Sequence, residues 1–144
     1  MMNNVEHNNP RDFVDEFGRN GLHHAANNGI LLKVEKLLNE GVDIDVKDNN
    51  GWTALHFAAQ NSHFKTIKLL LENKANPNLT ENQGNSPLWT ASMHANGKCK
   101  GVLLLLESGA NPNHKNNHGR SPFYIANTLK NGLVEAFSGF KGKS

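Results

Sequence analysis

The sequence has little of the chemistry that supports disulfides, metal clusters, export or membrane insertion. Its 144 residues include one cysteine, Cys99, which excludes an intrachain disulfide and a cysteine-based zinc cluster and fits a reducing compartment. The longest apolar run, residues 102–106, is far too short to span a bilayer, and the first twelve residues contain no apolar segment of a signal peptide. We therefore expect a cytoplasmic protein that does not enter membranes.

Strong charge of either sign and catalytic motifs are absent too. The 15 basic and 13 acidic residues leave a formal net charge of +2, too mild a bias to indicate a nucleic-acid surface. No nucleophile elbow, phosphate loop, dinucleotide fingerprint or paired-histidine zinc motif occurs. We expect no enzyme and no cofactor. Two rival classes stay open: a metal-dependent enzyme using His94, His114 and His118, and a nucleic-acid binder using the scattered lysines.

What the chain does contain is a repeat. The glycines Gly18, Gly51, Gly84 and Gly119 occupy equivalent positions along the sequence, and each is followed by a similar pattern of leucine or phenylalanine and alanine. The repeat divides the chain into units at 15–47, 48–80, 81–115 and 116–140, with an N-terminal capping segment at 1–14 and a tail at 141–144. The sequence therefore predicts a short solenoid.

The second unit shows the local structure that each repeat predicts. Residues 48–51 form a turn signature, Thr53 is a typical helix N-cap, and residues 54–61 and 64–73 carry apolar side chains at helical spacing. Lys74 stands where the equivalent positions hold Gly41 and Gly109, the residue that best ends a helix. A single helix pair buries too little apolar area to be stable alone, so the units must stack.

These segments resemble the ankyrin repeat. Residues 52–59, 85–92 and 120–127 are similar to its TPLHxAA signature, and residues 37–45, 70–78 and 105–113 are similar to its LLxxGAxxN segment. The resemblance implies an all-α ankyrin-repeat solenoid of about four helix-loop-helix units with short β-hairpin turns. It also implies a non-catalytic protein-binding module whose concave face is built from hairpin tips and first helices.

Small stand-alone ankyrin proteins of bacteria include immunity proteins that neutralise a partner toxin. The resemblance therefore implies one folded protein partner, with inhibition of a toxin as the leading role and an adaptor or assembly scaffold as the alternative. On its own the chain is expected to be a monomer.

His23 and His56 occupy the histidine of the TPLH-like segment. The resemblance implies a structural imidazole that hydrogen-bonds between neighbouring backbones. Trp89 and Tyr124 hold the same position in the third and fourth units, which argues against a metal ligand there.

The candidate binding residues fall in three rows on the expected concave face. They are Arg19, Trp52, Asn85 and Arg120 after the turn glycine; Asn49, Asn50, Asn82, Gln83, Asn117 and His118 before it; and Asn28, Gln60, Asn61, Met93 and His94 on the first helices. Trp52 is expected to project from its hairpin as a binding anchor, with packing against the neighbouring hairpin as the alternative.

The third unit is two residues longer than the second, and the extra residues fall within 93–101, between its helices. This loop is either a contact element with a positive edge from Lys98 and Lys100 or a tolerated insertion. At the ends, Pro10–Phe17 is expected to form a short capping helix, and residues 133–137 a truncated second helix, with Phe137 and Phe140 covering the last face of the stack.

Overall fold

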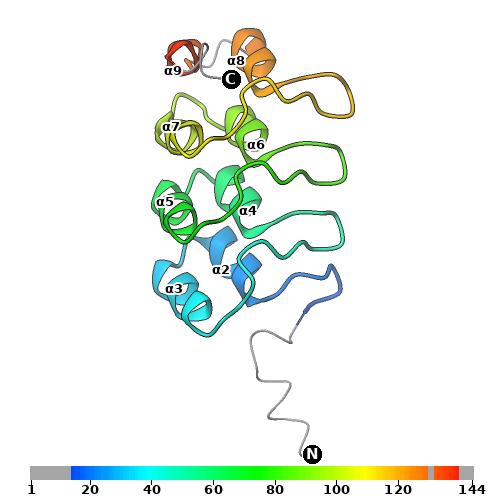
Figure 1. Cartoon of the computed structure of the whole chain (residues 1–144), viewed down its shortest axis with the longest axis vertical. Coiled ribbons are helices and arrows are strands. Elements are labelled where there is room, and N and C mark those ends of the chain that lie inside the picture. The colour runs from blue at the N-terminus through cyan, green and yellow to red at the C-terminus, as the bar shows by residue number, and fades with distance from the viewer. Residues whose placement is uncertain (1–13, 130–131, 140–144) are drawn as a thin grey trace, which may run out of the picture.

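The computed structural model describes residues 14–129 and 132–139, which fold into four stacked helix pairs (Figure 1). The pairs are α2 (Gly21–Asn28) with α3 (Leu31–Asn39), α4 (Ala54–Gln60) with α5 (Phe64–Glu72), α6 (Pro87–Met93) with α7 (Lys100–Glu107), and α8 (Pro122–Leu129) with α9 (Val134–Ser138). No β-strand occurs within these two ranges. The predicted all-α repeat solenoid is confirmed.

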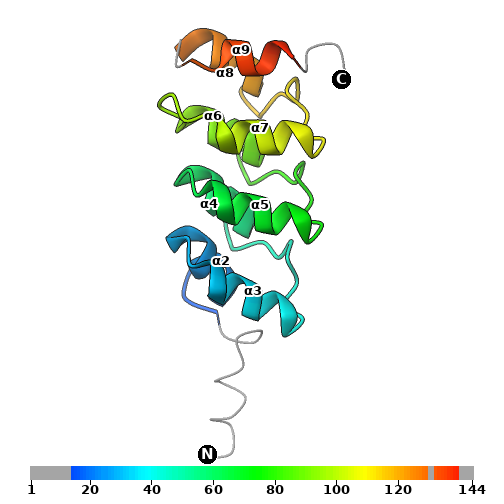
Figure 2. The same ribbon diagram turned by 90° about the vertical axis from the view of Figure 1, so that its left-hand side faces the viewer.

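The helices form two columns, one of first helices and one of second helices. α2, α4, α6 and α8 succeed one another in contact along the first column, and α3, α5 and α7 do so along the second. Figure 1 shows the columns side by side, with the loops that lead into the first helices extending away from the second column. Figure 2 views the stack from the side of the second helices.

Short polar side chains begin the first helices. The side-chain oxygens of Asn20, Thr53 and Ser86 accept hydrogen bonds from the backbone N–H of the third residue of α2, α4 and α6. At the end of α5, Lys74 adopts a φ of 72°, the left-handed conformation that Gly41 and Gly109 adopt after α3 and α7. The two helices predicted for the second unit, 54–61 and 64–73, are confirmed to within a residue.

The core lies between the two columns. Small side chains such as Ala25, Ala58 and Ala91 are buried on the first helices, where they let adjacent helices approach closely. The second helices contribute larger side chains, and Ile67 and Leu70 of α5 are both 0% exposed. Each unit thus buries its apolar face against its neighbours, as a solenoid requires.

The N-terminal capping helix is a wrong prediction over its described part. Residues 14–17 are not helical, because the N–H of Asp15 donates to the carbonyl of Arg19 and folds this segment into a turn. Residues 10–13 of the expected helix lie outside the described residues, as does Phe140. At the other end the truncated helix is present as α9, with Phe137 fully buried. No helix in the described ranges is long and apolar enough to cross a membrane.

Candidate protein-binding surface

Four hairpin turns, here called fingers, extend from the first-helix column on one side of the stack (Figure 1). They comprise residues 15–19, 48–52, 81–85 and 116–120. In each finger the N–H of the first residue donates to the carbonyl of the fifth, over 2.9 Å in the first, second and fourth fingers and 3.0 Å in the third. The hairpin turns expected from the sequence are therefore present as hydrogen-bonded turns.

The first side chain of each finger holds the turn together. One oxygen of Asp48 accepts the N–H groups of Asn50 and Trp52, at 2.9 and 2.8 Å. Asp15, Glu81 and Asn116 accept the equivalent pairs in the other fingers. This role was not predicted from the sequence, although an acceptor side chain stands three residues before the turn glycine in every unit.

Neighbouring fingers are joined to one another by backbone hydrogen bonds. The N–H groups of Asn49, Asn82 and Asn117 donate to carbonyls of the preceding finger at 2.9, 3.0 and 3.0 Å. Their side-chain amides also donate to backbone carbonyls of that finger, over 3.4, 3.4 and 3.1 Å. These three candidate residues are exposed, yet their amide groups belong to an internal ladder that fixes the spacing of the fingers.

The next residue in the second, third and fourth fingers has a different environment. Asn50, Gln83 and His118 are exposed, and their side chains make no hydrogen bond within residues 14–129 and 132–139. The structure thus separates the row of polar candidates into an internal ladder and an outward set, here defined as Asn50, Gln83 and His118. The side chains of the outward set therefore have all of their donors and acceptors available to another molecule.

Trp52 does not project into solvent, so the expected exposed anchor is wrong. Its ring is half-buried, with its centroid 5.1 Å from the ring of Phe57 and 5.5 Å from that of His56. The indole covers the apolar side of its own helix α4 instead of the neighbouring finger. This placement removes more aromatic surface from water than an extended side chain would.

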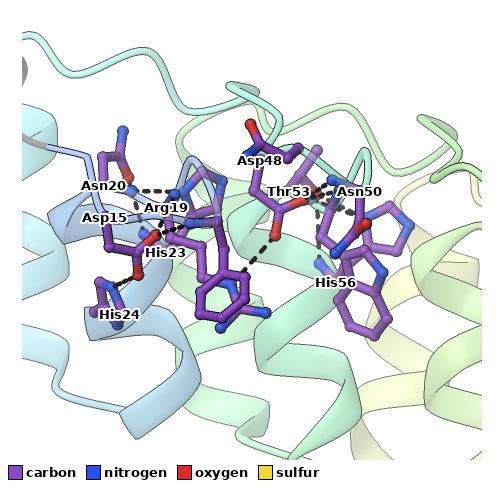
Figure 3. A network of polar contacts seen from close by, with 12 residues as sticks. Asp15, Arg19, Asn20, His23, His24, Asp48, Asn50, Thr53 and His56 are labelled. Atoms are coloured by element: carbon purple, nitrogen blue, oxygen red, sulfur yellow. Dashed lines mark hydrogen bonds and ion pairs between the residues drawn. The ribbon is translucent and has the colours of Figure 1, made fainter.

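The other candidate residues that follow the turn glycine differ in exposure. Arg19 is half-buried, with its Nε 3.4 Å from the Asp48 carboxylate (Figure 3). Its guanidinium lies over the rings of Phe17 and Phe57. Asn85 is buried, and its side-chain oxygen accepts the amide of Asn116 at 2.8 Å. Asn85 is therefore part of the interior rather than of an outward surface.

Arg120, the last residue of the row, is exposed beside an aromatic ring. Its guanidinium lies 5.9 Å from the ring centroid of Tyr124, which is itself 46% exposed. From the sequence, Tyr124 was identified only as the residue at the position equivalent to His23 and His56, and it was not predicted to be a binding residue. Its exposure next to Arg120 adds it to the candidate surface, since tyrosine and arginine are common in protein interfaces.

His23 and His56 have the structural role that the family resemblance implied (Figure 3). In each, Nδ1 accepts the N–H of the N-cap residue, Asn20 or Thr53. Nε2 therefore carries the proton and donates to the carbonyl of Val46 or Asn85, at 2.9 Å in both cases. Burial lowers the pKa of His23, and it lowers the pKa of His56 to about 4, so both rings are neutral near pH 7.

Residues at the ends of the first helices form the opposite edge of this surface. Asn61 donates to the side-chain and backbone oxygens of Asn27, at 2.8 and 3.1 Å, and is thereby tied to the preceding unit. Gln60 is half-buried. Asn28, Met93 and His94 are exposed, although His94 Nδ1 also lies 2.9 Å from the carbonyl of Thr90.

The inserted loop lies where the sequence placed it. It runs over residues 94–99 between α6 and α7, whereas residues 61–63 connect α4 and α5. Lys98 and Lys100 are exposed, and the ammonium of Lys100 lies 4.7 Å from the ring centroid of Phe64 on α5. The loop thus adds positive charge beside the second and third units.

In the part of the chain described here, no three His, Cys, Asp or Glu side chains are grouped to hold a metal ion.

Comparison with protein families gives the identity of the repeat. A family model described as ankyrin repeats in three copies matches residues 2–81 and 22–116. No curated protein matches the chain. The repeat period, the capped first helices, the finger ladder and this match together show that the chain belongs to the ankyrin repeat family, whose members are protein–protein interaction modules.

Proposed function

We propose that the chain binds one folded protein through its fingers and first helices and inhibits that protein without catalysis. The observation that carries this proposal is the division of the finger amides. The ladder of Asn49, Asn82 and Asn117 fixes the finger spacing before binding, which lowers the entropy cost of association. The outward set then offers unpaired polar groups at regular intervals to a rigid partner surface.

The size of the surface supports a folded partner. Adjacent helices in a stack pack about 8–10 Å apart, so four units give a face of roughly 35 Å. A standard interface needs about 800 Å² on each partner, which such a face can supply. Every described helix belongs to a repeat unit, so the described residues act by binding and by blocking access.

The partner we propose is a cytoplasmic toxin, which the chain would neutralise as an immunity protein. This choice rests on the likeness to small stand-alone ankyrin proteins, and a scaffold for assembly is the alternative that the same surface would serve. The two roles differ in outcome, because an immunity protein suppresses the activity of its partner whereas a scaffold leaves that activity intact.

The proposal is tested with the product of the reading frame adjacent to the gene for this chain. Its toxicity to the cell is measured with and without co-expression of the chain, and complex formation is measured by light scattering on the purified proteins. We expect a one-to-one complex and restored growth. A complex without restored growth would support the scaffold, and no complex would reject this partner.

The binding face is tested separately with three single variants, Asn50→Glu, Gln83→Glu and His118→Glu. Each adds a charge to the outward set, and an uncompensated charge in an interface weakens binding by about tenfold or more. Lys36→Glu and Lys68→Glu are matched controls on exposed positions of the second helices. If the controls weakened the complex and the outward variants did not, the partner would bind the other side of the stack.

A further inference from the structure

A cavity of about 430 Å³ lies between the second and third units, beside the inserted loop. Its inner wall is formed by Ala59, Ile67, Ala91 and Val102, which are all buried apolar side chains of four helices. Residues 97–101, which include the end of the inserted loop, form the other side. Sites for small organic molecules have volumes of about 300–1,000 Å³, so this cavity is large enough for one.

At the junction between the first and second units, the position equivalent to this cavity holds a smaller space. The corresponding space is about 210 Å³, and His63 occupies its edge with its Nε2 3.0 Å from the carbonyl of Asn27. The imidazole also lies so close to Gly29 that an added Cβ would come within 2.9 Å of it. A rigid ring therefore narrows the first junction at this position.

Two substitutions in the repeat open the second junction. Aligning Ile67 with Val102 and Leu70 with Leu105 places Lys98 at the position of His63 and Cys99 at that of Phe64. A flexible lysine and a small thiol thus replace two rings. The lysine is exposed at the edge of the cavity and the cysteine is half-buried in its wall.

The charges around the cavity have one sign. Lys98 and Lys100 line it, and no aspartate or glutamate is among its described lining residues. An apolar wall with two ammonium groups favours a molecule with an apolar body and one anionic end, because both parts then find complementary surroundings.

We propose that this cavity binds a small organic carboxylate, with its apolar body against Ile67 and Val102 and its carboxylate between Lys98 and Lys100. The inference concerns a site between the units and does not depend on the function proposed for the fingers. It requires no chemical step, since binding alone occupies the cavity.

Cys99 provides a direct measurement of occupancy, because it lines the cavity and is the single thiol of the chain. The rate at which iodoacetamide alkylates the full chain is measured with 4-phenylbutyrate, with its neutral amide and with inorganic phosphate. We expect the carboxylate to protect Cys99 in a saturable way, and the amide and phosphate to give little protection at the same concentration. Equal protection by the amide or by phosphate, or none by the carboxylate, would overturn the proposal.

A pair of double variants tests the role of the lysines. Lys98→Gln with Lys100→Gln should raise the carboxylate concentration needed for half-protection by about tenfold, the scale of a lost charge-assisted contact. Lys65→Gln with Lys68→Gln removes the same charge from exposed positions of α5 that do not line this cavity, and should leave that concentration unchanged. Equal effects of the two double variants would also overturn the proposal, since a general loss of charge would then explain binding. The acid and amide comparison on the unaltered chain needs no variant to fold.

Discussion

The imidazole of His56 on α4 donates its Nε2 proton to the backbone carbonyl of Asn85 in the next finger, over 2.9 Å. The same ring accepts the N–H of Thr53 at its own helix start. One neutral side chain therefore joins the cap of one unit to the finger of the next. Protonation at Nδ1 would break the bond to Thr53 and place a charge in the core.

We expect the stability of the chain to fall as the pH drops below about 6.5. The folded pKa of His56 is about 4, below its value of 6.5 in the unfolded chain. Between these values the unfolded state binds a proton that the folded state does not, so unfolding is favoured as pH falls, whereas both states are neutral above 6.5. By proton linkage, this residue alone lowers the free energy of unfolding by about 3 kcal/mol at pH 4 relative to pH 7. The lowered pKa of His23 acts in the same direction.

Urea unfolding at pH 7.5 and pH 4.5 measures this loss. Carboxylates also titrate in this range, so the comparison is made with His56→Gln, which keeps a polar side chain but cannot take up a proton. The pH dependence of the variant should be shallower than that of the unaltered chain. A control, His118→Gln on the exposed finger tip, should retain the full dependence, and equal slopes for all three proteins would contradict the assignment.

Gly84→Ala should destabilise the chain more than Gly119→Ala. Both glycines have positive φ, 82° and 73°, so an alanine at either is strained by a similar amount, about 1–2 kcal/mol. At Gly84 the added Cβ would also lie 2.5 Å from the amide oxygen of Asn117 and 2.9 Å from its backbone N, whereas at Gly119 no described atom lies within 4 Å. Thermal melting compares the two variants, and the additional loss of stability in Gly84→Ala measures the contact between fingers. Equal losses of stability in both variants would show that the ladder contributes little.

Lys74→Gly should stabilise the chain. Lys74 holds a φ of 72° after α5, where a side chain costs about 1 kcal/mol relative to glycine. The side chain is exposed, so little packing is lost. Chemical unfolding should show a gain of about 0.5–1 kcal/mol, offset in part by the greater freedom of glycine in the unfolded chain. Lys68→Gly, in the interior of α5, is the control and should lower the free energy of unfolding by about 1 kcal/mol.

Trp52→Ala is expected to lower stability, because the indole packs on Phe57 and His56 instead of projecting into solvent. A half-buried ring should cost about 2 kcal/mol, less than Leu70→Ala, for which removal of a fully buried side chain costs about 2–5 kcal/mol. Urea unfolding compares the two. An unchanged midpoint for Trp52→Ala would restore the interpretation of this residue as an exposed anchor.

The fold was predictable from the sequence because local and long-range signals agree at each unit. Thr53 starts a helix by its own hydrogen bonding, and the alanine spacing then sets which face is buried. The repeat supplied the stacking that no single unit determines. The N-terminal helix was predicted from Pro10 and the phenylalanine spacing, yet Asp15 follows the pattern of Asp48 and makes a finger instead.

The candidate surface was less predictable, since contacts between units decide which polar side chains remain available. Asn82 and Gln83 are adjacent and equally polar in sequence, but only Asn82 donates to the preceding finger. The direction of Trp52 was predicted wrongly because its ring partner Phe57 is specific to this unit, where the other first helices have His24, Thr90 and Ile125. Sequence periodicity gives the position of a side chain along the unit but not its direction.

Deletion of Asn96 and Gly97 is expected to separate stability from binding. The two residues are exposed at the turn of the inserted loop, with φ values of 46° and 83°, and removing them brings the third unit to the length of the second. Stability should change by about 1 kcal/mol or less, because a shorter loop can still join α6 to α7. The proposed toxin partner should bind about tenfold or more weakly, since Lys98 and Lys100 would shift away from the face that carries Met93 and His94.

Thermal melting and titration calorimetry on the deletion variant measure stability and binding, with Asn73→Ala on an exposed helix end as the matched control. Affinity within about threefold of the unaltered chain would make the loop a tolerated insertion and remove its lysines from the binding surface.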